Sequence, residues 1–100
     1  MIDRLERLAA AGINLVPADI TSHFIFERDG FVAFVERRED QFGNVGAPGL
    51  MTDRGMAVLI WRGPQPVFIG KGFEQVATEE QVEKIRAFGH DLEKAILATD

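Results

Sequence analysis

Hydrophobic positions near the start of the chain repeat at helical spacing. One side of residues 2–11 is apolar, because hydrophobic residues recur there along a helical stripe: Ile2, Leu5, Leu8 and Ala9. Gly12 follows as a residue that readily takes the left-handed conformation of a helix C-terminal cap. Pro17 then disfavours helix in the next stretch. The pattern predicts a short N-terminal helix followed by strands.

Residues 21–38 are rich in Phe, Ile and Val and are interrupted only by Asp29-Gly30. This dipeptide tolerates the positive φ angles of a tight hairpin turn. We therefore predict strands at 21–28 and 31–38. Counting back from a two-residue turn pairs Phe26 with Ala33 and His23 with Glu36.

A second hairpin is predicted further along the chain. An apolar run at 56–61 meets Gly63-Pro64-Gln65-Pro66 and resumes at 67–69, which is typical of two strands joined by a proline-containing turn. Gly70-Lys71-Gly72 would weaken the end of the last strand, and we interpret it as a bulge.

The C-terminal part has the pattern of a helix that begins with a capping box. In Thr78-Glu79-Glu80-Gln81, the first and last side chains can cap each other's backbone N–H groups. Apolar residues then repeat every three or four positions: Val82, Ile85, Phe88, Gly89, Leu92 and Ile96. The helix should end near Leu97.

These elements predict an α+β fold in the order α-β-β-β-β-α. An antiparallel sheet of about four strands, made of two hairpins, would be flanked by an N-terminal and a C-terminal helix. The 100 residues fit a single domain, 1–100, with enough core to need no disulfide.

Strand parity assigns side chains to the two faces of the sheet. The first hairpin has a clear core face: Phe24, Phe26, Phe31, Ala33 and Val35. Its other face is mixed: His23, Ile25, Glu27, Val32, Phe34 and Glu36. The second hairpin is apolar on both faces, with Val58, Ile60, Val67 and Ile69 on one and Leu59, Trp61 and Phe68 on the other.

Two helices cover only one face of such a sheet, so the opposite face is left over. It would expose Ile25, Phe34 and one face of the second hairpin, either the face that holds Trp61 or the face that holds Ile60. This apolar patch is larger than monomers usually show. We predict a homodimer with these candidate interface residues: Ile25, Phe34, Trp61 and Phe68. A groove for a small ligand or partner peptide, or a sheet curled so that both faces are hidden, are the alternatives.

Composition and charge exclude several kinds of catalytic site and partner. The chain has no cysteine, which excludes thiol nucleophiles, thiolate zinc sites and iron–sulfur clusters. A net charge of −5 argues against a nucleic-acid partner. Residues 1–20 mix charged and apolar positions from the outset, so we expect no signal peptide, no membrane span and a cytoplasmic location.

The paired His23 and Glu36 are the first candidate for chemistry, and we interpret them as a structural ion pair rather than a functional dyad. Glu27 is about 13 Å along the strand from His23, too far to share a metal ion. Ser22 and His23 should point to opposite faces, which argues against a serine nucleophile. His90 is expected to be an ordinary solvated histidine. We predict no metal site and no catalytic residue.

Residues 42–55 form the most unusual segment, predicted as a long loop with glycines at 43, 46, 49 and 55. The glycines match neither phosphate-binding fingerprint, and packing against the core or a neighbouring subunit is favoured. Five polar residues near this loop and the sheet are candidates for ligand binding: His23, Glu36, Asp53, Arg54 and Lys71.

The sequence therefore favours a small interaction or self-association module without catalytic activity or cofactor. The alternative is a small-ligand-binding or catalytic protein whose site lies between the sheet face and loop 42–55. The partner would be a second copy, another protein or a small molecule.

Overall fold

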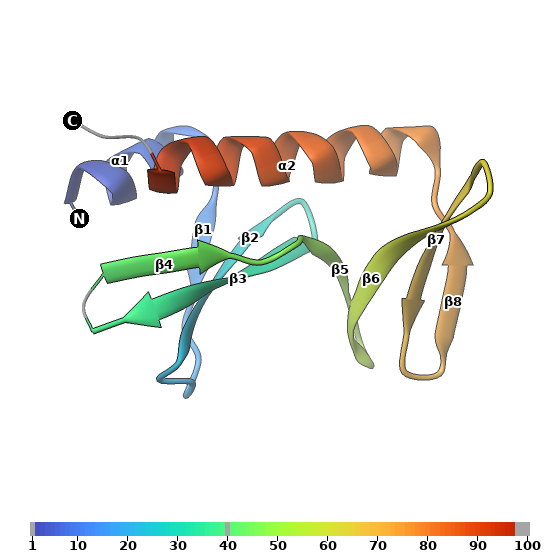
Figure 1. Cartoon of the computed structure of the whole chain (residues 1–100), viewed down its shortest axis with the longest axis horizontal. Helices are drawn as coiled ribbons and strands as arrows, with labels where there is room; N and C mark the ends of the chain where they lie inside the picture. Colours follow the sequence, from blue (N-terminus) through green and yellow to red (C-terminus); the bar gives the residue numbers. More distant parts are fainter. Residues whose placement is uncertain (1, 40, 98–100) are drawn as a thin grey trace.

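The computed structural model describes residues 2–39 and 41–97, without the side chains of residues 2 and 3. Helix α1 (Ile2–Ala10) comes first and helix α2 (Glu79–Leu97) comes last. Eight strands lie between them: β1 (Asn14–Val16), β2 (His23–Arg28), β3 (Phe31–Arg38), β4 (Gln41–Val45), β5 (Gly49–Thr52), β6 (Gly55–Arg62), β7 (Gln65–Gly70) and β8 (Phe73–Val76). Figure 1 shows α2 running across the strands, with α1 beside its C-terminal end.

The strands form one curled antiparallel sheet in the order β1-β2-β3-β5-β6-β7-β8, and β4 pairs with β3. The α+β class and the two flanking helices are confirmed. The prediction of about four strands is wrong, because the sheet has eight. The additional strands are three to five residues long, too short for a clear alternating pattern.

The β2–β3 hairpin has the predicted register, including the pairs Phe26–Ala33 and His23–Glu36. Its two-residue turn has positive φ angles of 55° at Asp29 and 85° at Gly30. The carboxylate of Glu27 accepts a hydrogen bond from the Gly30 N–H at 3.1 Å. The turn residues therefore set which side chains of this hairpin face the core.

Residues 42–55 are not the long loop that the glycines predicted. β4 pairs with the C-terminal half of β3, β5 pairs with Phe31 and Val32, and residues 46–48 link the two strands. The Gly46 N–H donates to the carbonyl of Phe34 at 2.8 Å. A Cβ on Gly49 would lie only 2.5 Å from the carbonyl oxygen of Ala57. These two glycines allow close backbone packing within the sheet.

The second hairpin, β6–β7, is also confirmed and pairs Leu59 with Phe68. Gly70-Lys71-Gly72 is not a bulge, because Gly70 pairs with Phe73 and residues 71–72 form a tight turn into β8. The φ of Gly72 is 67°, which favours glycine at this turn.

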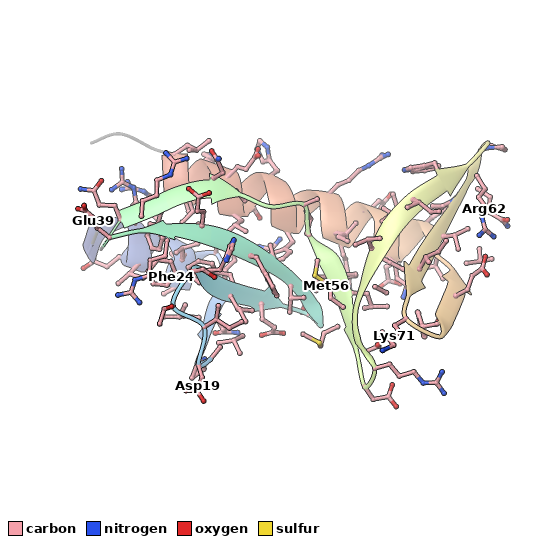
Figure 2. The ribbon with its side chains drawn as sticks, turned by 60° about the horizontal axis from the view of Figure 1, so that its bottom comes forward. Asp19, Phe24, Glu39, Met56, Arg62 and Lys71 are labelled. Atoms are coloured by element: carbon pink, nitrogen blue, oxygen red, sulfur yellow. The ribbon has the colours of Figure 1, made fainter. Side chains whose placement is uncertain are left out.

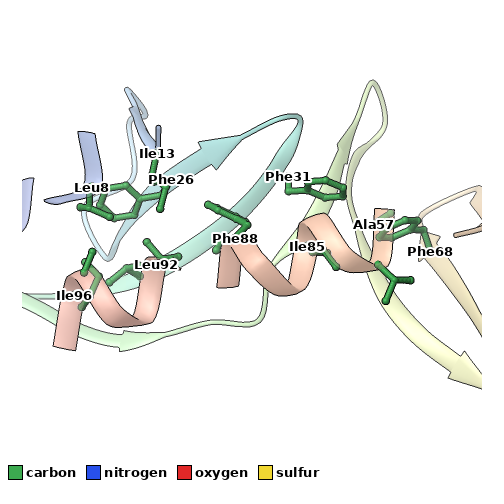
Figure 3. Packing of buried hydrophobic residues seen from close by; sticks show 14 of the residues in the cluster. Leu8, Ile13, Phe26, Phe31, Ala57, Phe68, Ile85, Phe88, Leu92 and Ile96 are labelled. Carbon is green, nitrogen blue, oxygen red and sulfur yellow. The ribbon is translucent and has the colours of Figure 1, made fainter. Parts of the chain in front are cut away.

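The core lies between α2 and one face of the sheet, which we call the inner face; the opposite face is the outer face. α2 directs Ile85, Phe88 and Leu92 toward this face (Figure 3). The sheet contributes a set of buried apolar side chains: Phe26, Phe31, Ala33, Val35, Ala57 and Phe68. α2 thus covers the Leu59, Trp61 and Phe68 side of the second hairpin, a choice that the sequence left open.

The ends of α2 are fixed by specific hydrogen bonds. The predicted capping box is present, since the Thr78 N–H donates to Gln81 Oε1 at 2.9 Å and the Gln81 N–H donates to Thr78 Oγ1 at 3.1 Å. Near the other end, Arg4 Nε of α1 donates to the carbonyl of Ile96 at 2.8 Å. None of the helices in the described part of the chain is both long and apolar enough to cross a lipid bilayer.

Candidate functional site

The outer face of the sheet is the largest feature that the core does not use. The strand registers place ten apolar side chains on it, which we call the outer apolar face: Ile25, Val32, Phe34, Met51, Met56, Val58, Ile60, Val67, Ile69 and Val76. Four of them are substantially exposed, namely Met51 (46%), Val58 (47%), Ile60 (37%) and Val76 (52%). α1 and α2 lie on the other side of the sheet. Val32 and Val67 are nevertheless only 2% exposed, so neighbouring side chains already cover part of this face.

The outer apolar face is continuous across the sheet. On its β6–β8 side, Val58 pairs with Ile69, and Ile60, Val67 and Val76 stand opposite one another on three strands. Between Val58 of β6 and Val32 of β3, the paired position on β5 is Gly49, which has no side chain. The Met56 side chain lies over this gap, with its Cε 2.5 Å from where a Cβ on Gly49 would be. Figure 2 shows Met56 between the two halves of the sheet.

Charged residues of both signs border this face. Arg62 and Glu74 form an ion pair on exposed parts of β6 and β8. At the β3 end, the Glu36 carboxylate accepts a hydrogen bond from Arg38. An apolar centre with a charged margin is the usual anatomy of a protein interface.

The four predicted interface residues divide between the two faces. Ile25 and Phe34 pair with each other on the outer face and are half-buried. The prediction for Phe68 is wrong, because α2 covers its face and the side chain is fully buried. Trp61 also faces inward but lies beyond the well-covered core, so it is 49% exposed.

Two of the predicted ligand-binding residues, His23 and Glu36, are cross-strand partners as expected. These two described side chains form no ion pair or hydrogen bond with each other, so the predicted ion pair is wrong. Arg38 donates to Glu36 instead, and Ser22 Oγ lies 2.8 Å from His23 Nδ1. The expectation that the Ser22 and His23 side chains could not meet is therefore wrong. Ser22 precedes β2, so strand alternation does not apply to it.

The other three predicted ligand-binding residues lie on two neighbouring turns. Asp53 and Arg54 form the β5–β6 turn, and Lys71 lies in the β7–β8 turn. Arg54 Nη1 donates to the Gly72 carbonyl at 2.6 Å, which joins the two turns. His23 and Glu36 are on β2 and β3 instead, so the five residues do not form one site between the sheet and the segment 42–55.

A cleft of about 580 Å³ lies beside α2 and was not predicted from the sequence. We call it the α2 groove. The β4–β5 link forms one wall, Leu59 and Ile85 contribute apolar surface, and the helix side holds Arg86, His90 and Glu93. No sequence pattern marked these residues as a group, because they come from segments far apart in the chain.

No protein family, curated protein or solved structure matches this chain. Within residues 2–39 and 41–97, no group of three or more His, Asp or Glu side chains is placed to hold a metal ion. The outer apolar face and the α2 groove are therefore the features from which a function can be inferred.

Proposed function

We propose that this protein is a small non-catalytic module that forms a homodimer through the outer apolar face. The observation that supports this proposal is the exposure of Met51, Val58, Ile60 and Val76 within one continuous apolar surface. Monomeric proteins rarely expose a contiguous apolar patch of more than a few hundred Å². Covering this patch removes its apolar surface from water, which favours association.

The size of the face is suited to a dimer. It extends over six strands, which at about 4.8 Å spacing gives a width of about 29 Å. Five residues along the longer strands add about 17 Å in the other direction, so the sheet laid flat would have a footprint of about 500 Å². Side-chain relief makes the accessible area larger than this footprint. A standard interface buries about 800 Å² on each partner, so the face is of the right order.

The charged margin is compatible with a second copy of the same chain. A two-fold axis places each patch against itself, so a margin of one sign would repel its copy. Here the margin holds both signs, as in the Arg62–Glu74 pair. Two sheets can pack face to face about 10 Å apart with their side chains interdigitated, the arrangement that we propose for the dimer.

Light scattering tests this proposal, with the mass measured over a tenfold range of protein concentration. We expect the wild-type protein to keep a mass of two chains. Val58→Lys and Met51→Lys should each give a folded monomer, because both place an ammonium group inside the interface. Circular dichroism and thermal melting will show that the variants are folded.

The matched control is Leu97→Lys. Leu97 is 65% exposed, but it lies on α2, on the other side of the sheet. This variant should remain dimeric. A monomeric wild-type protein, or a dimer that both interface variants leave intact, would refute the proposed interface.

A further inference from the structure

One edge of β6 is paired only along its first half. β5 pairs with β6 as far as Gly49 opposite Val58. The next position would set Pro48 opposite Leu59, and proline has no N–H to continue the ladder. The link 46–48 leaves β6 at this point and passes beside α2, where Pro48 meets Gly89.

The unpaired half of this edge presents backbone hydrogen-bonding groups to the α2 groove. In an antiparallel ladder, the N–H and C=O of one residue point to the same edge, and successive residues alternate between edges. Arg62 pairs with Gln65 across a two-residue turn, so Arg62, Ile60 and Val58 bond to β7. Leu59 and Trp61 therefore direct their backbone groups to the opposite edge, where β5 has already ended.

The groove beside this edge can accept a peptide. Its volume of about 580 Å³ is in the range of ligand clefts, and Leu59 contributes to its lining. Trp61 lies next to it and, although it faces inward, is 49% exposed. A partly covered inward-facing tryptophan beside a free strand edge is an apolar contact point for an incoming side chain.

Charge at the groove indicates the kind of peptide. The guanidinium of Arg86 lies 5.5 Å from the centre of the Trp61 ring. Arg86 forms no ion pair with a carboxylate of the described residues, whereas Arg28, Arg38 and Arg62 each do. Glu93 also lines the groove, about two helical turns from Arg86. An acidic side chain placed at Arg86, away from the Glu93 carboxylate, would supply the missing partner.

We propose that the α2 groove binds an extended segment of another protein, which adds a strand to β6 at Leu59 and Trp61 and places an acidic side chain on Arg86. The added strand takes the place that the β4–β5 link vacates at Pro48. Main-chain hydrogen bonds would supply affinity, and the Trp61 and Arg86 contacts would select the sequence. The Trp61 and Arg86 contacts lie on the inner side of the sheet, whereas the dimer interface uses the outer face.

The test begins with a display library of random twelve-residue peptides, selected on the intact wild-type protein. The strongest peptide is synthesised with a fluorescent label, and its affinity is measured by anisotropy. Amide hydrogen exchange is then measured with and without this peptide. We expect new protection at Leu59 and Trp61 and little change at Ile60 and Arg62, which are already bonded to β7.

Variants distinguish specific binding in the α2 groove from non-specific peptide binding. Arg86→Glu and Trp61→Ala should each weaken binding of the selected peptide by about tenfold or more. Lys94→Glu changes the same charge on another side of the same helix and should leave the affinity unchanged. Val58→Lys should also retain peptide binding, so failure of the dimer proposal and failure of this one can be distinguished.

Three results would overturn the proposal. The first is a library that yields no peptide whose binding depends on Arg86 and Trp61. The second is a bound peptide that leaves the Leu59 and Trp61 amides unprotected. The third is protection of these amides that rises with protein concentration in the absence of peptide, which would assign the edge to a second copy of this chain.

Discussion

Pro48 of the β4–β5 link packs directly against Gly89 of α2. A Cβ on Gly89 would lie 3.2 Å from Pro48 Cγ, closer than an ordinary van der Waals contact. This contact sets where the link crosses the helix, and the link in turn forms a wall of the α2 groove. The absence of a side chain at one helix position thus helps to shape the groove.

We expect Gly89→Val to lower the free energy of unfolding by about 2 kcal/mol, because the branched side chain overpacks against Pro48. Ala87→Val is the control on an exposed position of the same helix and should cost only about 0.6 kcal/mol of helix propensity. Urea unfolding at one fixed protein concentration measures both. Equal effects of the two substitutions would show that the link yields freely to the added side chain.

Arg28 joins the β2–β3 hairpin to α2 and to the residue that follows α1. Its Nη1 donates to the carbonyl of Ala11 and to Asp91 Oδ2, both at 2.9 Å, and its guanidinium lies over the Phe88 ring. Arg28→Met keeps much of the apolar stem but loses these bonds, and we expect a loss of about 2 kcal/mol in unfolding free energy.

The control for this substitution is Lys84→Met, which removes an exposed ion pair with Glu80 within α2. Exposed pairs of this kind contribute less than about 0.5 kcal/mol. If Arg28→Met lowered the unfolding free energy no more than Lys84→Met, the stability of the hairpin would not depend on the hydrogen bonds of Arg28.

The capping box should contribute measurably to α2. Thr78→Ala removes the hydroxyl that accepts the Gln81 N–H, and we expect it to cost about 1 kcal/mol of unfolding free energy. Thr21→Ala, at an exposed position before β2, is the matched control and should have almost no effect. A comparison of the two urea midpoints tests this directly, and identical midpoints would contradict it.

Phe68 should behave as a core residue rather than an interface residue. Phe68→Ala leaves a cavity beneath α2, and we expect a loss of about 3–5 kcal/mol, enough to unfold much of the protein. Leu97→Ala removes an apolar side chain that is 65% exposed and should change stability by less than about 0.5 kcal/mol. A folded Phe68→Ala protein with wild-type stability would contradict the core assignment.

The parts of the fold that the sequence predicts are those with strong local signals. Asp29-Gly30 determines the β2–β3 register because few other dipeptides accept both positive φ angles. Thr78 and Gln81 mark the start of α2 because their side chains satisfy backbone groups that would otherwise lack partners. In both cases a few adjacent residues determine the local geometry.

The parts that were missed depend on contacts between distant segments. β8 has mostly exposed side chains, and β4 includes Gly43, so neither shows the alternation of a half-buried strand. The α2 groove combines Leu59, Pro48 and Arg86, whose proximity follows from the point at which the link leaves β6. The sequence predicts an ordinary solvated histidine at position 90, because nothing near it in the chain indicates a groove. In the structure His90 lines the α2 groove.

Helix α2 also imposes an order on folding during protein synthesis. All eight strands precede it in the chain, yet Val82, Ile85, Phe88, Leu92 and Ile96 of this helix cover the buried side of the sheet. A nascent chain on the ribosome would therefore hold a nearly complete set of strands with apolar surface on both sides until α2 emerges. During that interval the growing chain would be most exposed to aggregation and most in need of chaperones.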